Sequence, residues 1–273
     1  HGLAVSGSGA GSKMIAPLLL LQGGDEALLR AIETHAAGAW PAPDLVSLNG
    51  WECRFAPASK SRRVNSLTPM DPVQGRFAQT LAVARRLCRE RGVPCTVRVT
   101  PAMQENEVAL LIEEGFVQKD TTFVKILPLG GVPQADPTVV LLQPPHSAWL
   151  ADYAALTQMS AEERQVIDSM LSHVEGEMIL ASLTVAGEIV SMGRAVVRNG
   201  LIGLFQIATS PSARRQGYAH RLVQSLLHWG RQQGAMRAYL QVVDENIAAR
   251  SLYRSLGFKT FYGYTYFVKD ETR

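Results

Sequence analysis

The residues with the clearest chemical potential form a short junction, Ser210-Pro-Ser-Ala-Arg-Arg-Gln-Gly-Tyr-Ala-His-Arg-Leu222, between an apolar run and a helical pattern. The first backbone N–H groups of a helix lack partners within it, and its dipole places partial positive charge there, so such a junction suits phosphate. Gly217 allows the backbone to approach an anion closely, and Ala219 leaves the first turn uncrowded. Arg214 and Arg215 add positive charge. The junction has the composition of a pyrophosphate-binding loop, although a solvated turn can share the same short pattern.

A second motif follows one helix and one strand later, at Asn246-Ile-Ala-Ala-Arg-Ser-Leu-Tyr-Arg-Ser-Leu-Gly-Phe258. Together with the Arg-x-x-Gly-x-Ala spacing of Arg214, Gly217 and Ala219, it resembles the GNAT superfamily of acetyl-CoA-dependent N-acyltransferases. The resemblance covers about residues 138–270 and includes the order of the predicted elements. Two separated motifs in the expected order make this resemblance specific.

The resemblance implies that acetyl-CoA is the acyl donor. In this superfamily the pantetheine arm lies between two splayed strands and bonds to the backbone, a position that residues 207–209 occupy here. The pyrophosphate would contact the N–H groups of residues 216–219, and Asn246 would either bond near the pantetheine or act as a helix N-cap. The implied cofactor-binding residues are Ile207, Ala208, Thr209, Arg214, Arg215, Gln216, Gly217, Tyr218, Ala219, Asn246 and Tyr253.

The implied catalytic residue is Tyr253, which matches a tyrosine that often lies near the cofactor sulfur in this superfamily. A phenol can stabilise or protonate a departing thiolate, whereas the alternative role for Tyr253 is packing beside Phe258. Some relatives carry a general base at the position of Gly203, where this chain has no carboxylate. The substitutes that the sequence offers are His173, Glu175 and Glu177, each with the character of an ordinary surface residue. A chain of water molecules is the remaining route for the proton.

The chain contains a second, altered copy of this pattern. Asn65–Phe116 aligns with Ile207–Phe258 at one constant offset without a gap. At the positions of Arg214, Ala219, Asn246 and Tyr253 the first copy has Pro72, Phe77, Gln104 and Leu111. These changes remove a charge, crowd the loop and delete the hydroxyl, so we expect a degenerate GNAT-like domain that binds no acetyl-CoA.

The elements around these motifs predict a mixed α/β fold with two tandem GNAT-like domains, each a central mixed β-sheet flanked by helices. Asn199-Gly200 between apolar runs is a strong hairpin signal, and Ala186-Gly187 separates the preceding pair. A last hairpin is expected over Phe258–Val268, where alternation should bury half of the aromatic rings, and Tyr262 and Tyr264 are candidates for lining an acceptor pocket. Further predicted helices span 25–35, 147–158, 160–173, 217–233 and 246–256, and further strands 51–55, 138–143, 178–185, 188–197, 201–209 and 237–243.

The chain divides at the Pro- and Gly-rich run Leu127–Pro137, which has no periodicity and is typical of a linker. We predict a degenerate domain over 14–127, a linker over 128–137 and a catalytic domain over 138–273. Residues 1–13 are rich in Gly and Ser and resemble an artificial leader rather than a signal peptide, and the short run Ile15–Leu21 is expected to be a strand.

The composition is that of a globular protein of 273 residues, 47% hydrophobic and 19% charged, with a formal charge of +3. It contains no long basic run and no stripe of interleaved aromatic and basic residues, so we expect no nucleic-acid partner, and no run is long enough to suggest a membrane partner. Cys53, Cys88 and Cys95 lack the spacing of a zinc site and are expected to be reduced and mostly buried. The default expectations are a cytoplasmic monomer or homodimer without a bound metal.

The sequence therefore predicts an acetyl-CoA-dependent N-acetyltransferase that acts on a primary amine of a small molecule or peptide. The alternative is a non-catalytic sensor that binds acyl-CoA, which the missing base favours and Tyr253 argues against. A purely structural α/β module would require both motifs to be coincidental.

Overall fold

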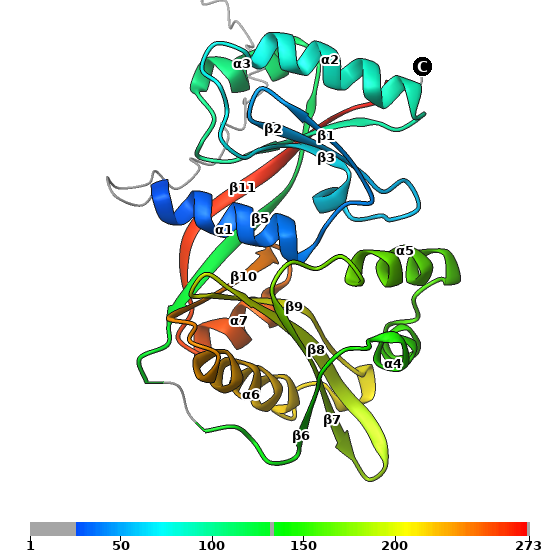
Figure 1. The fold of residues 1–273 in the computed structure, drawn as a ribbon, viewed down its shortest axis with the longest axis vertical. Coiled ribbons are helices and arrows are strands. Elements are labelled where there is room, and N and C mark those ends of the chain that lie inside the picture. The colour runs from blue at the N-terminus through cyan, green and yellow to red at the C-terminus, as the bar shows by residue number, and fades with distance from the viewer. Residues whose placement is uncertain (1–25, 132–133, 272–273) are drawn as a thin grey trace, which may run out of the picture.

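The computed structural model describes residues 26–131 and 134–271, so the predictions for residues 1–13 and for the strand at 15–21 lie outside the described residues (Figure 1). The first half contains α1 (Glu26–Ala39), β1 (Asp44–Leu48), β2 (Trp51–Phe55), the 3-10 helix η1 (Arg62–Val64), β3 (Ser66–Pro69), α2 (Phe77–Glu90), β4 (Cys95–Val99), α3 (Glu105–Glu113) and β5 (Val117–Pro128). The second half contains β6 (Val139–Leu142), α4 (Ser147–Thr157), α5 (Ala161–Leu171), β7 (Glu177–Val185), β8 (Glu188–Arg198), β9 (Leu201–Thr209), the 3-10 helix η2 (Pro211–Ala213), α6 (Tyr218–Gln232), β10 (Arg237–Val243), α7 (Ile247–Ser255) and β11 (Lys259–Lys269).

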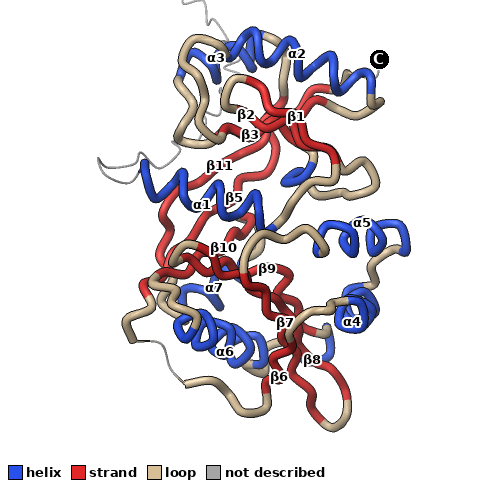
Figure 2. The backbone as a smooth tube through the Cα atoms, viewed as in Figure 1, coloured by secondary structure: helices blue, strands red, loops and turns tan. Residues whose placement is uncertain are grey.

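All the described strands belong to one mixed sheet, in the order β1-β2-β3-β4-β11-β5-β10-β9-β8-β7-β6 (Figure 2). Helices flank the sheet, which confirms the mixed α/β class. The predicted turns are present, because Ala186, Gly187, Asn199 and Gly200 all adopt positive φ. None of the described helices has the length and apolar character needed to cross a bilayer.

The internal repeat is visible in the way corresponding helices end. Gly92 and Gly234 follow α2 and α6, Gly115 and Gly257 follow α3 and α7, and all four have positive φ. The N–H of Phe116 bonds to the carbonyl of Leu111, and the same bond joins Phe258 to Tyr253. The constant offset of the sequence alignment therefore holds from the loop to the last strand.

The gapless alignment is wrong for the strand that precedes each loop. Leu67 pairs with Val97 in the first half, whereas Gly203 pairs with Tyr239 in the second. Because Val97 and Tyr239 are matched, Leu67 corresponds to Gly203 rather than to Thr209. The second half thus has extra residues between the paired part of β9 and α6, and these form one wall of the candidate site.

The two halves exchange their last strands. β5 belongs to the first half in sequence but pairs with β10 of the second half, from Thr122↔Val243 to Pro128↔Arg237. β11 pairs with β4 of the first half and with β5, and Figure 1 shows β11 and β5 crossing the middle of the molecule side by side. The prediction of a hairpin over Phe258–Val268 is therefore wrong, since this segment is one continuous strand with partners from the other half.

The strands of the second half carry different helices on their two faces. Tyr239 and Phe205 pack with α1, α4 and α5, whereas Ala238 and Leu204 pack with α6 and α7. Every second residue from Tyr262 to Tyr266 places its ring on the face of the sheet that α1 covers. Phe267 packs in the core of the first half. The three cysteines are free and buried, as predicted.

Candidate active site

The central feature of the second half is a gap between two parallel strands. β9 pairs with β10 only at Leu201, Ile202 and Gly203, although both strands continue further. A β-bulge with Gln206 at φ 54° interrupts the pairing of β9 with β8 and redirects the strand. Burial changes at the same point, because Phe205 is buried whereas residues 206–209 are half-buried. Beyond Gly203, the backbone N–H and C=O groups on this edge of β9 therefore have no partner strand. An extended ligand could bind them as an additional strand would.

The gap leads into the loop that ends at the first turn of α6. Gly217 has φ 82° at the N-cap of the helix, and a side chain added there would meet nothing within 4 Å. Arg214 and Arg215 are exposed and make no hydrogen bond or ion pair to the described residues. Gln216 is exposed beside them, and Tyr218 and Ala219 are half-buried. Open helix N–H groups, free arginines and open space above a glycine fit a bound pyrophosphate.

The last two predicted site residues lie on α7. Asn246 is the N-cap of this helix, and its side chain accepts a hydrogen bond of 3.0 Å from the N–H of Ala249. Tyr253 is 7% exposed and packs edge-to-face on Phe258, with ring centroids 6.0 Å apart. Burial raises its pKa to about 12, so its hydroxyl stays protonated near neutral pH and can donate a hydrogen bond or a proton.

The structure explains why no carboxylate stands at Gly203. A Cβ atom there would lie 2.6 Å from the Phe205 ring and 2.7 Å from the Tyr239 hydroxyl. The Tyr239 hydroxyl lies 2.8 Å from Nδ1 of His35, whose pKa burial lowers to about 4, so this imidazole is neutral near pH 7. A buried His–Tyr pair from α1 and β10, neutral near pH 7, thus fills the space at Gly203.

The substitute bases named from the sequence do not reach the gap. Glu175 forms an ion pair with Arg198, Glu177 begins β7 opposite Val197, and His173 bonds to a backbone carbonyl. They lie near the Asn199-Gly200 turn, at the start of β9, whereas the gap opens at its other end.

Sequence reasoning missed a set of polar side chains on the α1 face, beside the gap. Arg194 of β8 donates a bond of 2.6 Å to Gln206, and Tyr264 donates one of 2.9 Å to Gln241 of β10. Glu33 of α1 is buried against Arg98 and Tyr262. Arg194 stands in an apolar run and Glu33 on a helix with no recognised motif, so only the sheet order brings them together.

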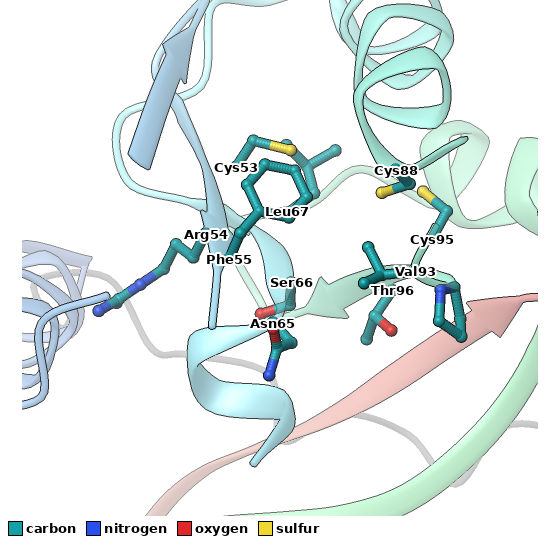
Figure 3. A pocket seen from close by; sticks show the side chains of 11 residues that line it. Cys53, Arg54, Phe55, Asn65, Ser66, Leu67, Cys88, Val93, Cys95 and Thr96 are labelled. Carbon is teal, nitrogen blue, oxygen red and sulfur yellow. The ribbon is translucent and has the colours of Figure 1, made fainter. Parts of the chain in front are cut away.

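The first half is packed where it matches the paired start of β9 and β10. A cavity of about 10 Å³, roughly the room for one water molecule, lies among β2, α2 and the first residues of β3 and β4, and Figure 3 shows Phe55, Leu67 and the three cysteines around it. Phe77 is buried against Trp51 with ring centroids 5.1 Å apart, and Leu111 is fully buried. The side chains that replace Ala219 and Tyr253 are thus part of a packed core.

A separate open groove of about 760 Å³ lies between α4 and α5, where Ala151, Ala155 and Arg164 are among its lining residues. It contains none of the residues of the gap or of the loop. Within residues 26–131 and 134–271, only the gap combines free strand edges, a helix N-terminus and free cationic side chains.

Comparison with known proteins agrees with this geometry. A family model described as "Probable histone acetyltransferase Rv0428c C-terminal" matches residues 27–267. The chain is 25% identical over 247 residues to "Uncharacterized N-acetyltransferase YobR" of Bacillus subtilis, covering 88% of this chain and 98% of that protein. It is 28% identical over 243 residues to "Probable histone acetyltransferase Rv0428c" of Mycobacterium tuberculosis, covering 85% of this chain and 71% of that protein.

Solved structures share the fold at lower identity. A GCN5-related N-acetyltransferase from Kribbella flavida superimposes with a TM-score of 0.66 at 14% identity, covering 88% of this chain and 95% of that one. A tandem GNAT protein from the clavulanic acid biosynthesis pathway superimposes with a TM-score of 0.59 at 14% identity, covering 92% and 97% of the two chains. The fold and these relatives define the protein as an acyltransferase of the GNAT superfamily. Within it, the chain belongs to the family of the Rv0428c C-terminal acetyltransferase.

Proposed function

We propose that the second half of this protein transfers an acetyl group from acetyl-CoA to a primary amine. The observation that carries this proposal is the gap between β9 and β10 that runs directly into the open N-terminus of α6. The edge of residues 207–209 would bond to the pantetheine arm, and residues 214–219 would hold the pyrophosphate. The N-cap role of Asn246 would set the direction of α7 and thereby the position of Tyr253.

Acetyl-CoA supplies an activated thioester, so transfer forms an N–C bond, breaks the C–S bond and moves one proton from the amine to the departing sulfur. The Tyr253 hydroxyl makes no hydrogen bond to the described residues and stays protonated, which suits stabilisation of the sulfur as it gains charge. Gly203 carries no carboxylate, and a Cβ atom there would meet the Phe205 ring and the Tyr239 hydroxyl, so the amine's proton would leave through water. The half-buried stretch of β9 beyond Phe205 would admit that water.

The direct test is a screen of small amines, amino acids and peptides with acetyl-CoA, in which free thiol and acetylated product are measured together. We expect both to appear in equal amounts with at least one acceptor class. Tight binding of acetyl-CoA without acceptor-dependent thiol release would instead support the acyl-CoA sensor, which the filled space at Gly203 favours.

Gly217→Val should weaken acetyl-CoA binding by about tenfold or more, because a β-branched side chain would occupy the open space above the loop and disfavour positive φ. The matched control is Gly75→Val, since Gly75 has φ 72°, an equally open surrounding and the aligned position, one residue before the N-cap Arg76 of α2. Calorimetry should show normal acetyl-CoA affinity in the control, although both variants lose thermal stability. Equal affinity of Gly217→Val and the parent protein would remove the loop from the site.

We also expect one acetyl-CoA per chain. In the first half every residue of β3 is buried, Phe77 is part of the core, and Pro72 stands where Arg214 adds charge. Phe77→Ala should leave the stoichiometry at one, because it restores neither the charge nor the longer splayed strand. A calorimetric titration that saturates at two molecules per chain would contradict this expectation.

A further inference from the structure

On the α1 face beside the gap, cationic side chains lack ion-pair partners and N–H donors lack acceptors among the described residues. We call the residues Arg63, Arg194, Gln206 and Gln241 the donor face. They come from η1, β8, β9 and β10, so both halves of the chain contribute to it. Arg63, Gln206 and Gln241 are half-buried, so part of each residue is exposed beside the fully buried Arg194.

Arg194 is a fully buried cation without a carboxylate partner among the described residues. Its guanidinium lies between the rings of Trp40 and Phe205, 4.8 and 4.7 Å from their centroids. It donates to Gln206 and, over 3.0 Å, to the carbonyl of Ala39, and both of these acceptors are uncharged. Burial lowers its pKa to about 9, so the group remains mostly charged near pH 7. A buried charge without a counter-ion is costly, and an anion at this place would offset that cost.

Arg63 adds a second cation on the same face, because its neighbour Val64 packs in the same apolar core as Trp40 and Phe205. Its charge lowers the pKa of Arg194 further, after burial, and partly offsets the rise that burial causes in the pKa of Tyr239. Arg63 forms no ion pair or hydrogen bond with the described residues, whereas its neighbour Arg62 pairs with Asp120. The segment that holds it is fixed, because Asn65 makes bonds of 2.8 to 3.1 Å with Ala56, Ser59 and Ser61.

Two carboxamides complete the donor face. The Gln206 oxygen accepts from Arg194 and the Gln241 oxygen accepts from Tyr264, so each amide directs its NH₂ group away from these partners. Both Nε2 atoms are buried without a hydrogen-bond partner. The two side chains come from the splayed strands on either side of the gap. The polar groups of the donor face that lack a hydrogen-bond or ion-pair partner are thus all N–H donors. A ligand rich in acceptor oxygens would satisfy them.

The nearby carboxylates are already engaged. Glu33 is paired with Arg98 at 2.8 Å and accepts a bond from Tyr262, and both members of the ion pair are 2% exposed. Glu52 lies 3.9 Å from Arg54. The pyrophosphate site at the start of α6 has its own free arginines, Arg214 and Arg215, on the exposed loop. The donor face is therefore distinct from both the buried ion pair and the phosphate site.

We propose that the acceptor amine carries a carboxylate group, which binds the donor face through Arg63 while the amine points to the gap. This inference rests on the proposed acetyl transfer and names its substrate class. A free amino acid or a peptide with acidic side chains supplies this chemistry, whereas a strongly basic peptide would be repelled by Arg63 and Arg194.

The experiment compares acceptors that differ only in that charge. L-amino acids are assayed against their carboxamides, lysine peptides bearing aspartate against the same peptides bearing asparagine, and a lysine-rich basic peptide completes the panel. We expect acids to exceed amides in kcat/KM by about ten- to a hundredfold, as for a lost charge-assisted hydrogen bond. The amino-acid and peptide arms identify which source is preferred. Equal kcat/KM for acids and amides, or faster turnover of the basic peptide, would overturn the inference.

Arg63→Gln should reduce the acid-to-amide selectivity about tenfold or more, mainly through KM. The matched control is Arg62→Gln, which removes a neighbouring surface cation that is paired with Asp120 and should preserve the selectivity. Calorimetry of the same acid and amide pairs on the CoA-saturated protein reports on the donor face without turnover. Preference for acids in binding without thiol release would refute the acetyl transfer but keep the donor face, whereas no preference in binding would refute the donor face itself.

Discussion

Residues 138–273 expressed without the first half should neither unfold cooperatively nor bind acetyl-CoA. The reason is the strand exchange, because β10 forms one wall of the gap and its other edge is covered by β5 from the first half. Without β5, the edge of β10 from Arg237 to Val243 is exposed, and β11 loses both of its neighbours, β4 and β5. An exposed strand edge promotes aggregation, and a strand without neighbours loses its order.

Complementation provides the control for this prediction. Residues 1–131 and 134–273 expressed together should co-purify and recover acetyl-CoA binding, since no strand or helix is cut. Circular dichroism during heating and calorimetry with acetyl-CoA measure the two properties. A monomeric 138–273 fragment with a cooperative transition and normal acetyl-CoA affinity would show that β5 is dispensable for the site.

Tyr253→Phe should lower turnover by about ten- to a thousandfold, the range for one lost proton-transfer or charge-stabilising group, while acetyl-CoA affinity stays nearly unchanged. The ring still packs on Phe258, so stability should change little. Because burial raises the pKa of Tyr253 to about 12, its ionisation should add no alkaline limb to the pH profile below about pH 11.

The matched control is Tyr153→Phe. Tyr153 lies on α4 on the opposite face of the sheet, is 8% exposed, and has a pKa that burial raises to about 12. Removing its hydroxyl tests the effect of deleting a buried phenolic oxygen on the other face of the sheet. Steady-state kinetics with one good acceptor should separate the two variants, and equal turnover of Tyr253→Phe and the parent would make Tyr253 a packing residue.

Local features of the second half were predictable from the sequence because their causes are local. Positive φ at Asn199 and Gly200 depends on two adjacent residues, and the apolar runs beside them were sufficient to predict the hairpin. The Asn246 cap and the glycine that ends α7 depend on contacts within one helical turn. The loop from Arg214 to Ala219 was predictable for the same reason, since a helix N-terminus and a glycine define it.

The polar environment of the site was not predictable in this way. His35 and Tyr239, or Arg63 and Arg194, are distant in sequence, and neither pair forms a motif. The filled space at Gly203 depends on rings from β9 and β10 that meet only when the strands are aligned. Such contacts follow from sheet order, which a single sequence with two similar halves leaves open.

By itself, the sequence determined the superfamily, the repeated elements and the replacement of Arg214 and Ala219 by Pro72 and Phe77 in the first half, because turn chemistry, caps and side-chain volume act over short distances. Only the tertiary structure decided that Leu67 corresponds to Gly203, that β5 and β11 change places, and that both halves contribute to the donor face. The physical reason is that the backbone N–H and C=O groups of β11 and β5 can form the same hydrogen bonds with any antiparallel neighbour. The choice between a hairpin and an exchanged strand therefore depends on the packing of the whole sheet rather than on the residues of the strand.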